Sequence, residues 1–235
     1  MQVSKMKINC ENLTARKINE AIMQSSERIV CENCCGQRYI GAASSGKTIE
    51  IEGISGNDCG GLLDGSTLIL KGNAQEGLGD TMNAGKIIVH GHCGDICAYG
   101  MRGGKIFIRD YIGVRGGIHM KEYGDSKPLL MIGETAGACL GEYLAGGTII
   151  VLNRRDELDP VENVGVGQHG GVIYVRIATF DERNYEDVVD GSEIEAEISE
   201  FCEIFKMDKQ KLLHSKYRRL LPETKNPYQG YYCMN

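Results

Sequence analysis

Tryptophan is absent from this sequence of 235 residues, and proline and phenylalanine each occur only four times. No run of about 18 consecutive apolar residues is present that would span a bilayer as a helix. Lysine and arginine form no basic run and the formal net charge is −6, so we expect neither a nucleic acid nor a membrane as a partner. The N-terminal residues also lack the apolar segment of an export signal, and we therefore predict a soluble, cytoplasmic protein.

Glycine and cysteine, in contrast, are well represented. The 32 glycines amount to about twice the average usage, and together with the scarcity of proline they suggest a repeat. The ten cysteines are too sparse for a small disulfide scaffold. Without an export signal we expect them to be reduced thiols.

A repeat becomes visible when short β-rich runs are aligned. The first four runs begin 19 residues apart, and the later steps are 23, 20 and 24 residues. The runs are Thr48–Gly53, Thr67–Gly72, Lys86–Gly91, Lys105–Asp110, Pro128–Gly133, Thr148–Asn153 and Val172–Ile177. A nearly constant period of about 20 residues without helix-length segments is typical of a solenoid in which each repeat forms one coil.

Residues between these runs also fall into register. A glycine column contains Gly60, Gly79, Ala98, Gly141 and Gly165, and two apolar columns contain Leu63, Met82, Met101 and Leu144, and Cys59, Leu78, Cys97 and Leu140. Glycine columns fit a chain that turns corners in every coil, because glycine permits positive φ angles and close backbone approach. We predict an all-β fold, a single-stranded right-handed parallel β-helix of about seven coils. A left-handed hexapeptide solenoid would show a six-residue sub-period, which we do not find.

Both termini have helical patterns that suit the exposed ends of a solenoid. Thr14 is a candidate N-cap for a short helix with Ile18 and Ile22 on one face, and two more short helices are expected between residues 192 and 221. We divide the chain into an N-terminal helical cap at 1–30, a β-helix at 31–180 and a C-terminal helical extension at 181–235.

The strand alternation also defines an outward apolar stripe. Because Ile49 and Ile51 point inward and Glu50 points outward, the positions aligned with Glu50 face away from the core. Those positions are Ile69, Ile88, Phe107, Leu130, Ile150 and Tyr174. Such a stripe should not remain in water, so either the terminal helices lie on it or another chain docks there.

The residues with chemical potential form no recognisable catalytic set. Cys31, Cys34 and Cys35 have the spacing of a metal or redox motif, but there is no second pair, so a structural role is favoured and metal binding stays open. The histidines show no metal-ligand spacing. An independent enzyme would have to draw on His119, Glu122, Tyr123 and His169, which no spacing argument joins. We therefore assign no catalytic residue, cofactor or metal to this chain.

Several segments in fixed register resemble the GXGXG domain of glutamate synthase over roughly residues 8 to 180. They are Gly36–Gly41, Gly56–Gly60, Lys71–Gly85, Gly94–Gly104, Gly117–Tyr123, Gly137–Gly147 and the run that begins at Gly165. The first and fifth look like the stand-alone, archaeal-type version of the domain. The resemblance implies a non-catalytic structural subunit or domain of a glutamate synthase-type complex, which makes glutamate from glutamine and 2-oxoglutarate.

The resemblance also implies which partners to expect. In glutamate synthase this domain packs against the amidotransferase and flavin domains, and the FMN, the iron–sulfur cluster and the nucleophilic cysteine belong to those domains. We therefore expect a flavin subunit and a glutamine amidotransferase subunit as partners, and a homo-oligomer is also compatible with the sequence. One component of formylmethanofuran dehydrogenase shares this β-helix family and is the alternative, as is an independent metal or thiol protein.

Overall fold

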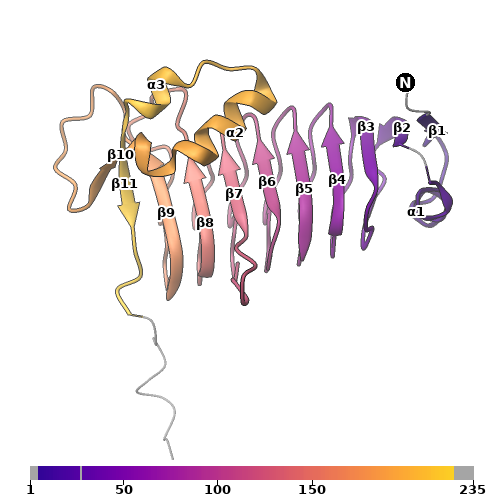
Figure 1. Cartoon of the computed structure of the whole chain (residues 1–235), viewed down its shortest axis with the longest axis horizontal. Coiled ribbons are helices and arrows are strands. Elements are labelled where there is room, and N and C mark those ends of the chain that lie inside the picture. Colours follow the sequence, from indigo (N-terminus) through magenta and orange to yellow (C-terminus); the bar gives the residue numbers. More distant parts are fainter. Residues whose placement is uncertain (1–4, 27, 225–235) are drawn as a thin grey trace, which may run out of the picture.

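The computed structural model describes residues 5–26 and 28–224 and forms a β-solenoid of about seven turns (Figure 1). Within these described residues eleven strands form one sheet, in which the first nine follow in chain order and pair in parallel. These nine strands are β1 (Lys5–Asn9), β2 (Arg28–Cys35), β3 (Thr48–Ile54), β4 (Asp64–Leu70), β5 (Ala84–Val89), β6 (Lys105–Ile108), β7 (Leu129–Ile132), β8 (Ala145–Val151) and β9 (Gly170–Arg176).

Stacked aliphatic side chains fill the interior of the solenoid. Because alternate residues of a strand point to opposite faces and equivalent residues of successive coils pair, one sequence position per coil forms a continuous buried row. One such row consists of Ile49, Leu68, Ile87, Ile106, Leu130, Ile149 and Ile173, all fully buried. The predicted β-helix is confirmed, and its core is packed with side chains along its length.

The pairing corrects the predicted alignment of β7. Lys105 pairs with Leu129 and Leu129 with Thr148, whereas the sequence alignment had placed Pro128 in this row. The shift of one residue turns Leu130 into the core and Met131 onto the outer face, so the prediction that Leu130 belongs to the outward stripe was wrong. Extra residues in the preceding loop hid the true register.

The N-terminal segment is both a cap and the start of the sheet. Helix α1 (Ala15–Gln24) begins after Thr14, whose side chain accepts a hydrogen bond from the Lys17 amide, and this confirms the predicted N-cap. Ile18 and Ile22 are fully buried in the interior core. Within 1–30, β1 and the beginning of β2 also pair in parallel, so this region adds strands as well as a helix to the solenoid.

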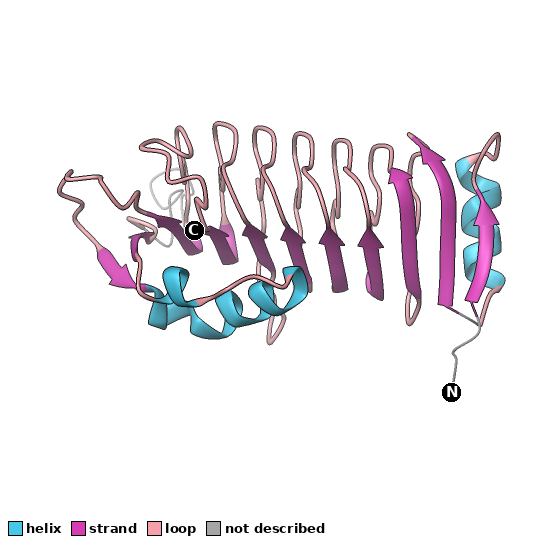
Figure 2. Ribbon diagram, turned by 90° about the horizontal axis from the view of Figure 1, so that it is seen from above, coloured by secondary structure: helices cyan, strands magenta, loops and turns pink. Residues whose placement is uncertain are grey.

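The C-terminal segment covers the outer face of the later strands. It contains β10 (Val188–Asp190), a 3₁₀ turn at Gly191–Ile194, α2 (Glu195–Phe205), α3 (Gln210–Leu213) and β11 (Lys216–Leu220), and the helices lie across one face of the strands (Figures 1 and 2). The outward stripe is buried beneath them in a second apolar cluster. The stripe positions in this cluster are Ile88, Phe107, Met131, Ile150 and Tyr174, with Ile69 packed at its border.

The contact between helix and sheet leaves no open docking stripe at Phe107 and Ile150. Both side chains are fully buried, and the ring of Phe107 lies 6.5 Å from that of Phe201 in α2. Glu200 of α2 pairs with Lys86 at 2.5 Å and with Lys105 at 2.6 Å, so one carboxylate joins two successive coils. At Phe107 and Ile150 the stripe is therefore covered by a terminal helix, the first of the two arrangements expected from the sequence.

The second predicted C-terminal helix is shorter than expected. Only Gln210–Leu213 is helical, and Lys216–Leu220 forms β11, which pairs antiparallel with β9 and with β10. The apolar spacing at Tyr217 and Leu220 is also compatible with the helix expected before residue 221, but the edge of β9 offers backbone hydrogen bonds that favour a strand here. Among the described residues no helix has the length and apolar character needed to cross a bilayer.

Candidate functional site

Each connection between successive strands from β2 to β9 carries the same unusual backbone turn, opposite the helix-covered face, where most of the loops lie (Figure 2). In each turn three residues at alternating positions have left-handed φ angles. These triplets are Tyr39, Gly41 and Ala43; Asp58, Gly60 and Leu62; Gly77, Gly79 and Thr81; Ile96, Ala98 and Gly100; Arg115, Gly117 and His119; Cys139, Gly141 and Tyr143; and Asn163, Gly165 and Gly167.

The middle residue of each triplet explains the glycine column. Gly60, Gly79, Gly141 and Gly165 have φ angles between 66° and 69°; Gly41 and Gly117 also belong to the column, and Ala98 takes the same place with a φ of 60°. A Cβ atom at Gly79 would lie 2.4 Å from Cδ1 of Ile106 inside the core. Both the backbone conformation and the packing therefore favour glycine here.

Exposed aromatic side chains lie at the last position of some triplets or directly before it. His119 stacks on Tyr143 with ring centroids 5.3 Å apart and an interplanar angle of 10°, and Tyr99 meets His119 edge to face at 6.1 Å. Tyr99 is 41% exposed and Tyr143 is 38% exposed. We call Tyr99, His119 and Tyr143 the aromatic ladder. Rings of this kind contribute strongly to protein interfaces.

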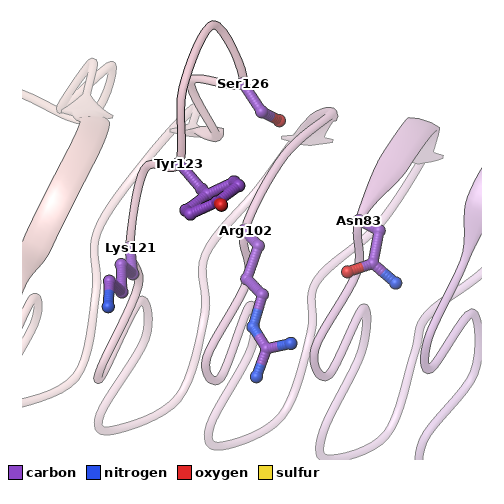
Figure 3. Close-up of a pocket in the computed structure, with 5 residues that line it drawn as sticks. All are labelled: Asn83, Arg102, Lys121, Tyr123 and Ser126. Carbon is purple, nitrogen blue, oxygen red and sulfur yellow. The ribbon is translucent and has the colours of Figure 1, made fainter.

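A separate cavity of ≈ 510 Å³ opens beside the turns, and Figure 3 shows the side chains that line it. They are Asn83, Arg102, Lys121, Tyr123 and Ser126. The first three lie 19 residues apart and occupy equivalent positions of successive coils, because their amides donate to the equivalent carbonyls Leu63, Met82 and Met101 of the preceding coil.

Tyr123 and Ser126 come from an extra loop. The step from Lys86 to Lys105 is 19 residues and the step from Lys105 to Leu129 is 24, so this coil contains five additional residues. Tyr123 and Ser126 exchange backbone hydrogen bonds of 3.1 Å and 3.0 Å, which close a tight turn around Gly124. The loop stands beside the coil that carries Arg102 (Figure 3).

The four residues that an independent enzyme would need form separate local contacts. His119 belongs to the aromatic ladder, and Oε2 of Glu122 accepts a hydrogen bond from the Gly147 amide. Tyr123 lines the cavity, and a ring nitrogen of His169 lies 3.1 Å from the carbonyl of Gly167. This arrangement does not assemble a nucleophile, base and oxyanion site from them.

The candidate metal cysteines diverge. Cys31 and Cys34 are buried with Cys10 in the first coils, whereas Cys35 is exposed. Hydrogen bonding to Cys10 and burial raise the pKa of the Cys31 and Cys34 thiols. Within 5–26 and 28–224, no group of three or more histidine, cysteine, aspartate or glutamate side chains is arranged to hold a metal ion. Cys31 and Cys34 fill the core as small apolar groups.

Comparison with known proteins assigns the family. The GXGXG motif family, that of the C-terminal domain of the glutamate synthase alpha subunit, matches residues 5–226. The chain belongs to this family. The alternating left-handed triplets give the motif its physical basis, because Gly77, Gly79 and, in the last coil, Gly165 and Gly167 occupy positions that L-residues rarely adopt.

An uncharacterized protein of Methanocaldococcus jannaschii is also similar. It is 41% identical over 251 residues, which cover 96% of this chain and 95% of that protein.

The cavity around Arg102 is the feature that reasoning from the sequence missed. The 19-residue spacing of Asn83, Arg102 and Lys121 was available as a signal. The loop that completes the cavity interrupts the period, so the spacing alone did not indicate a site.

Proposed function

We propose that this chain is a non-catalytic structural subunit of a glutamate synthase-type complex. It holds a glutaminase chain and an FMN-containing synthase chain so that ammonia released by the first reaches the second. The FMN and the iron–sulfur cluster reside on the partner chains, and the assembly works in the cytoplasm. Membership of the GXGXG motif family supports this role.

The aromatic ladder is the observation that carries the proposal. Its three rings extend over consecutive coils and stay exposed, while the apolar stripe on the opposite side is covered by α2. Other exposed apolar side chains continue along the turns on both sides of the ladder. They are Tyr39, Leu62, Ile96 and Val166. An extended apolar face of this kind is expected at a protein interface.

The rigidity of the solenoid suits a spacer between two enzymes. Each coil pairs with its neighbours through backbone hydrogen bonds in the strands and again in the turns, for example from the Gly79 amide to the Cys59 carbonyl at 2.9 Å. A continuous interior core joins the coils. The surfaces along the coils therefore keep fixed spacing, which a complex needs to align two active sites.

The test is purification of the tagged full-length chain from its native cell at its natural level, followed by mass spectrometry and a flavin absorbance spectrum. We expect a yellow synthase chain and a glutaminase to copurify, and the fraction to form glutamate from glutamine and 2-oxoglutarate. Recovery of the chain alone, or with molybdopterin-enzyme subunits, would overturn the proposal.

Two variants locate the contact surface. Tyr99→Asp combined with Tyr143→Asp should abolish copurification, because a charge replaces the apolar contact at the centre of the interface. Phe180→Asp is the matched control, since Phe180 is an exposed aromatic residue that follows β9 and lies outside the seven left-handed turns. If the partner chains still copurify with the double variant, the aromatic ladder is not part of the interface.

A further inference from the structure

The cavity beside the extra loop concentrates positive charge without compensation. Several cations elsewhere on the coils pair with carboxylates of neighbouring coils, as in Arg28 with Glu50 at 2.7 Å. Arg102 and Lys121 instead occupy adjacent positions of one column, about 4.8 Å apart along the solenoid. Within the described part of the chain neither side chain has a hydrogen-bond or ion-pair partner.

An anion held between these two exposed cations would relieve their mutual repulsion. Like charges at coil spacing repel each other, and none of the five lining side chains is acidic. Two acidic residues lie close to Lys121 in sequence. Glu122 is bonded to the Gly147 amide, and Asp125 of the extra loop is exposed and is not among the side chains that line the cavity. In a chain with a net charge of −6, two neighbouring unpaired cations therefore form a local basic site.

The other lining groups add neutral donors. Asn83 contributes a side-chain amide, Ser126 a hydroxyl and Tyr123 a phenol, all of which donate hydrogen bonds to oxyanions. Arg102 can offer two parallel N–H groups to a carboxylate or phosphate, and Lys121 supplies a point charge. Figure 3 shows Arg102 and Lys121 extending to the same side of their coils.

The loop closes on its neighbour because a glycine leaves room for it. A Cβ atom at Gly103 would lie 2.1 Å from the Ser126 hydroxyl and 2.2 Å from the Asn83 carbonyl oxygen. The reciprocal backbone bonds between Tyr123 and Ser126 hold the tip of the loop. The cavity is therefore formed before any ligand arrives, and its volume of ≈ 510 Å³ is in the range of small-molecule sites.

We propose that this cavity binds a small, doubly charged oxyanion, either a phosphate group or a dicarboxylate. Arg102 and Lys121 neutralise the two negative charges, and Asn83, Tyr123 and Ser126 orient the ligand. This binding function goes beyond the scaffold role and does not depend on it, because every group that makes the site belongs to this chain.

Isothermal titration calorimetry of the full-length chain at low ionic strength tests the proposal, with inorganic phosphate and succinate as separate probes. We expect saturable binding of at least one probe at one site per chain. Arg102→Gln and Lys121→Gln should each weaken it by about tenfold or more, as loss of a charge-assisted bond predicts. Lys17→Gln is the matched control, because Lys17 is an exposed cation on α1, and it should leave the affinity unchanged.

The outcomes separate clearly. Binding of phosphate alone assigns a phosphate ligand, binding of succinate alone assigns a dicarboxylate, and binding of both assigns a general dianion site. Absence of binding by both probes, or equal weakening by Lys17→Gln, overturns the proposal. Both site variants should melt at or slightly above the temperature of the wild type, since neither side chain has a partner to lose and each substitution removes the repulsion between the two cations. A folding defect therefore cannot be mistaken for lost binding.

Discussion

Substituting Gly79 by alanine separates the two reasons for the glycine column. At Gly79, with φ of +68°, the new Cβ atom would lie 2.4 Å from Ile106 Cδ1 and 3.3 Å from Ile87 Cδ1. Gly46 is the matched control, because its φ of +65° is nearly the same but nothing lies within 4 Å of an added Cβ atom. Gly46→Ala therefore measures backbone strain alone, and Gly79→Ala adds the cost of crowding the core.

The two costs can be estimated separately. A left-handed alanine costs roughly 1–2 kcal/mol, partly offset by about 0.4–1 kcal/mol from the lower entropy of the unfolded chain. Overpacking in a close-packed core adds about 1–3 kcal/mol. Because about 1 kcal/mol lowers the Tm of a chain of this size by roughly 2–4 °C, Gly79→Ala should melt several degrees below Gly46→Ala.

Thermal melts followed by circular dichroism provide the assay. Gly141→Ala should repeat the result, since its Cβ atom would lie 2.5 Å from Ile173 Cδ1. Ala98 offers the reverse test, because it already has a left-handed φ of 60°. Ala98→Gly should relieve strain, but the higher entropy of the unfolded glycine chain offsets this gain, so the Tm should be nearly unchanged. Indistinguishable Tm values for Gly46→Ala and Gly79→Ala would refute the packing argument for the column.

Three further predictions concern the covered face and the thiols. Phe107→Ala should lower stability by about 3–5 kcal/mol and expose α2 to limited proteolysis, because its ring is fully buried against Phe201; unchanged protection of α2 would contradict this. Burial alone would raise the pKa of the Glu200 carboxyl, but hydrogen bonds from two lysines hold this pKa below its usual value. The ion pairs of Glu200 therefore stabilise the fold at neutral pH, and this stabilisation is lost as the pH falls through the lowered pKa. Acid melts of Glu200→Gln should lack this loss. Burial raises the pKa of Cys59 to about 12, so iodoacetamide at pH near 8 should label Cys35 and spare Cys59 in mapped peptides.

The coil and its core could be predicted because they depend on local periodicity. A 19-residue repeat with alternating aliphatic residues is compatible with few structures other than stacked coils. A shift of strand register by one residue would turn the aliphatic side chains of that strand from the core to water. The glycine column was visible for the same reason, since the same backbone turn recurs in every coil. The error at β7 arose where a loop of five extra residues broke the period before Leu129.

The candidate sites could be predicted only in part. The 19-residue spacing of Asn83, Arg102 and Lys121 lies in the sequence, but the cavity exists only because the loop with Tyr123 and Ser126 stands beside them. The aromatic ladder joins residues 20 and 24 positions apart, so its contacts appear once the coils are stacked.

By itself the sequence determined the repeat, the buried rows, the glycine column and the helix after Thr14, because these follow from spacing and from the conformational range of each residue type. Only the tertiary structure decided what covers Phe107, that Lys216–Leu220 forms a strand and that Cys31 packs with Cys10. Each of these depends on contacts between segments far apart in the chain, such as α2 with β6 or β11 with β9. Local sequence patterns limit the conformations that a segment can adopt. Which of these conformations it takes depends on the free energy gained when the segment covers an exposed strand edge or an apolar face.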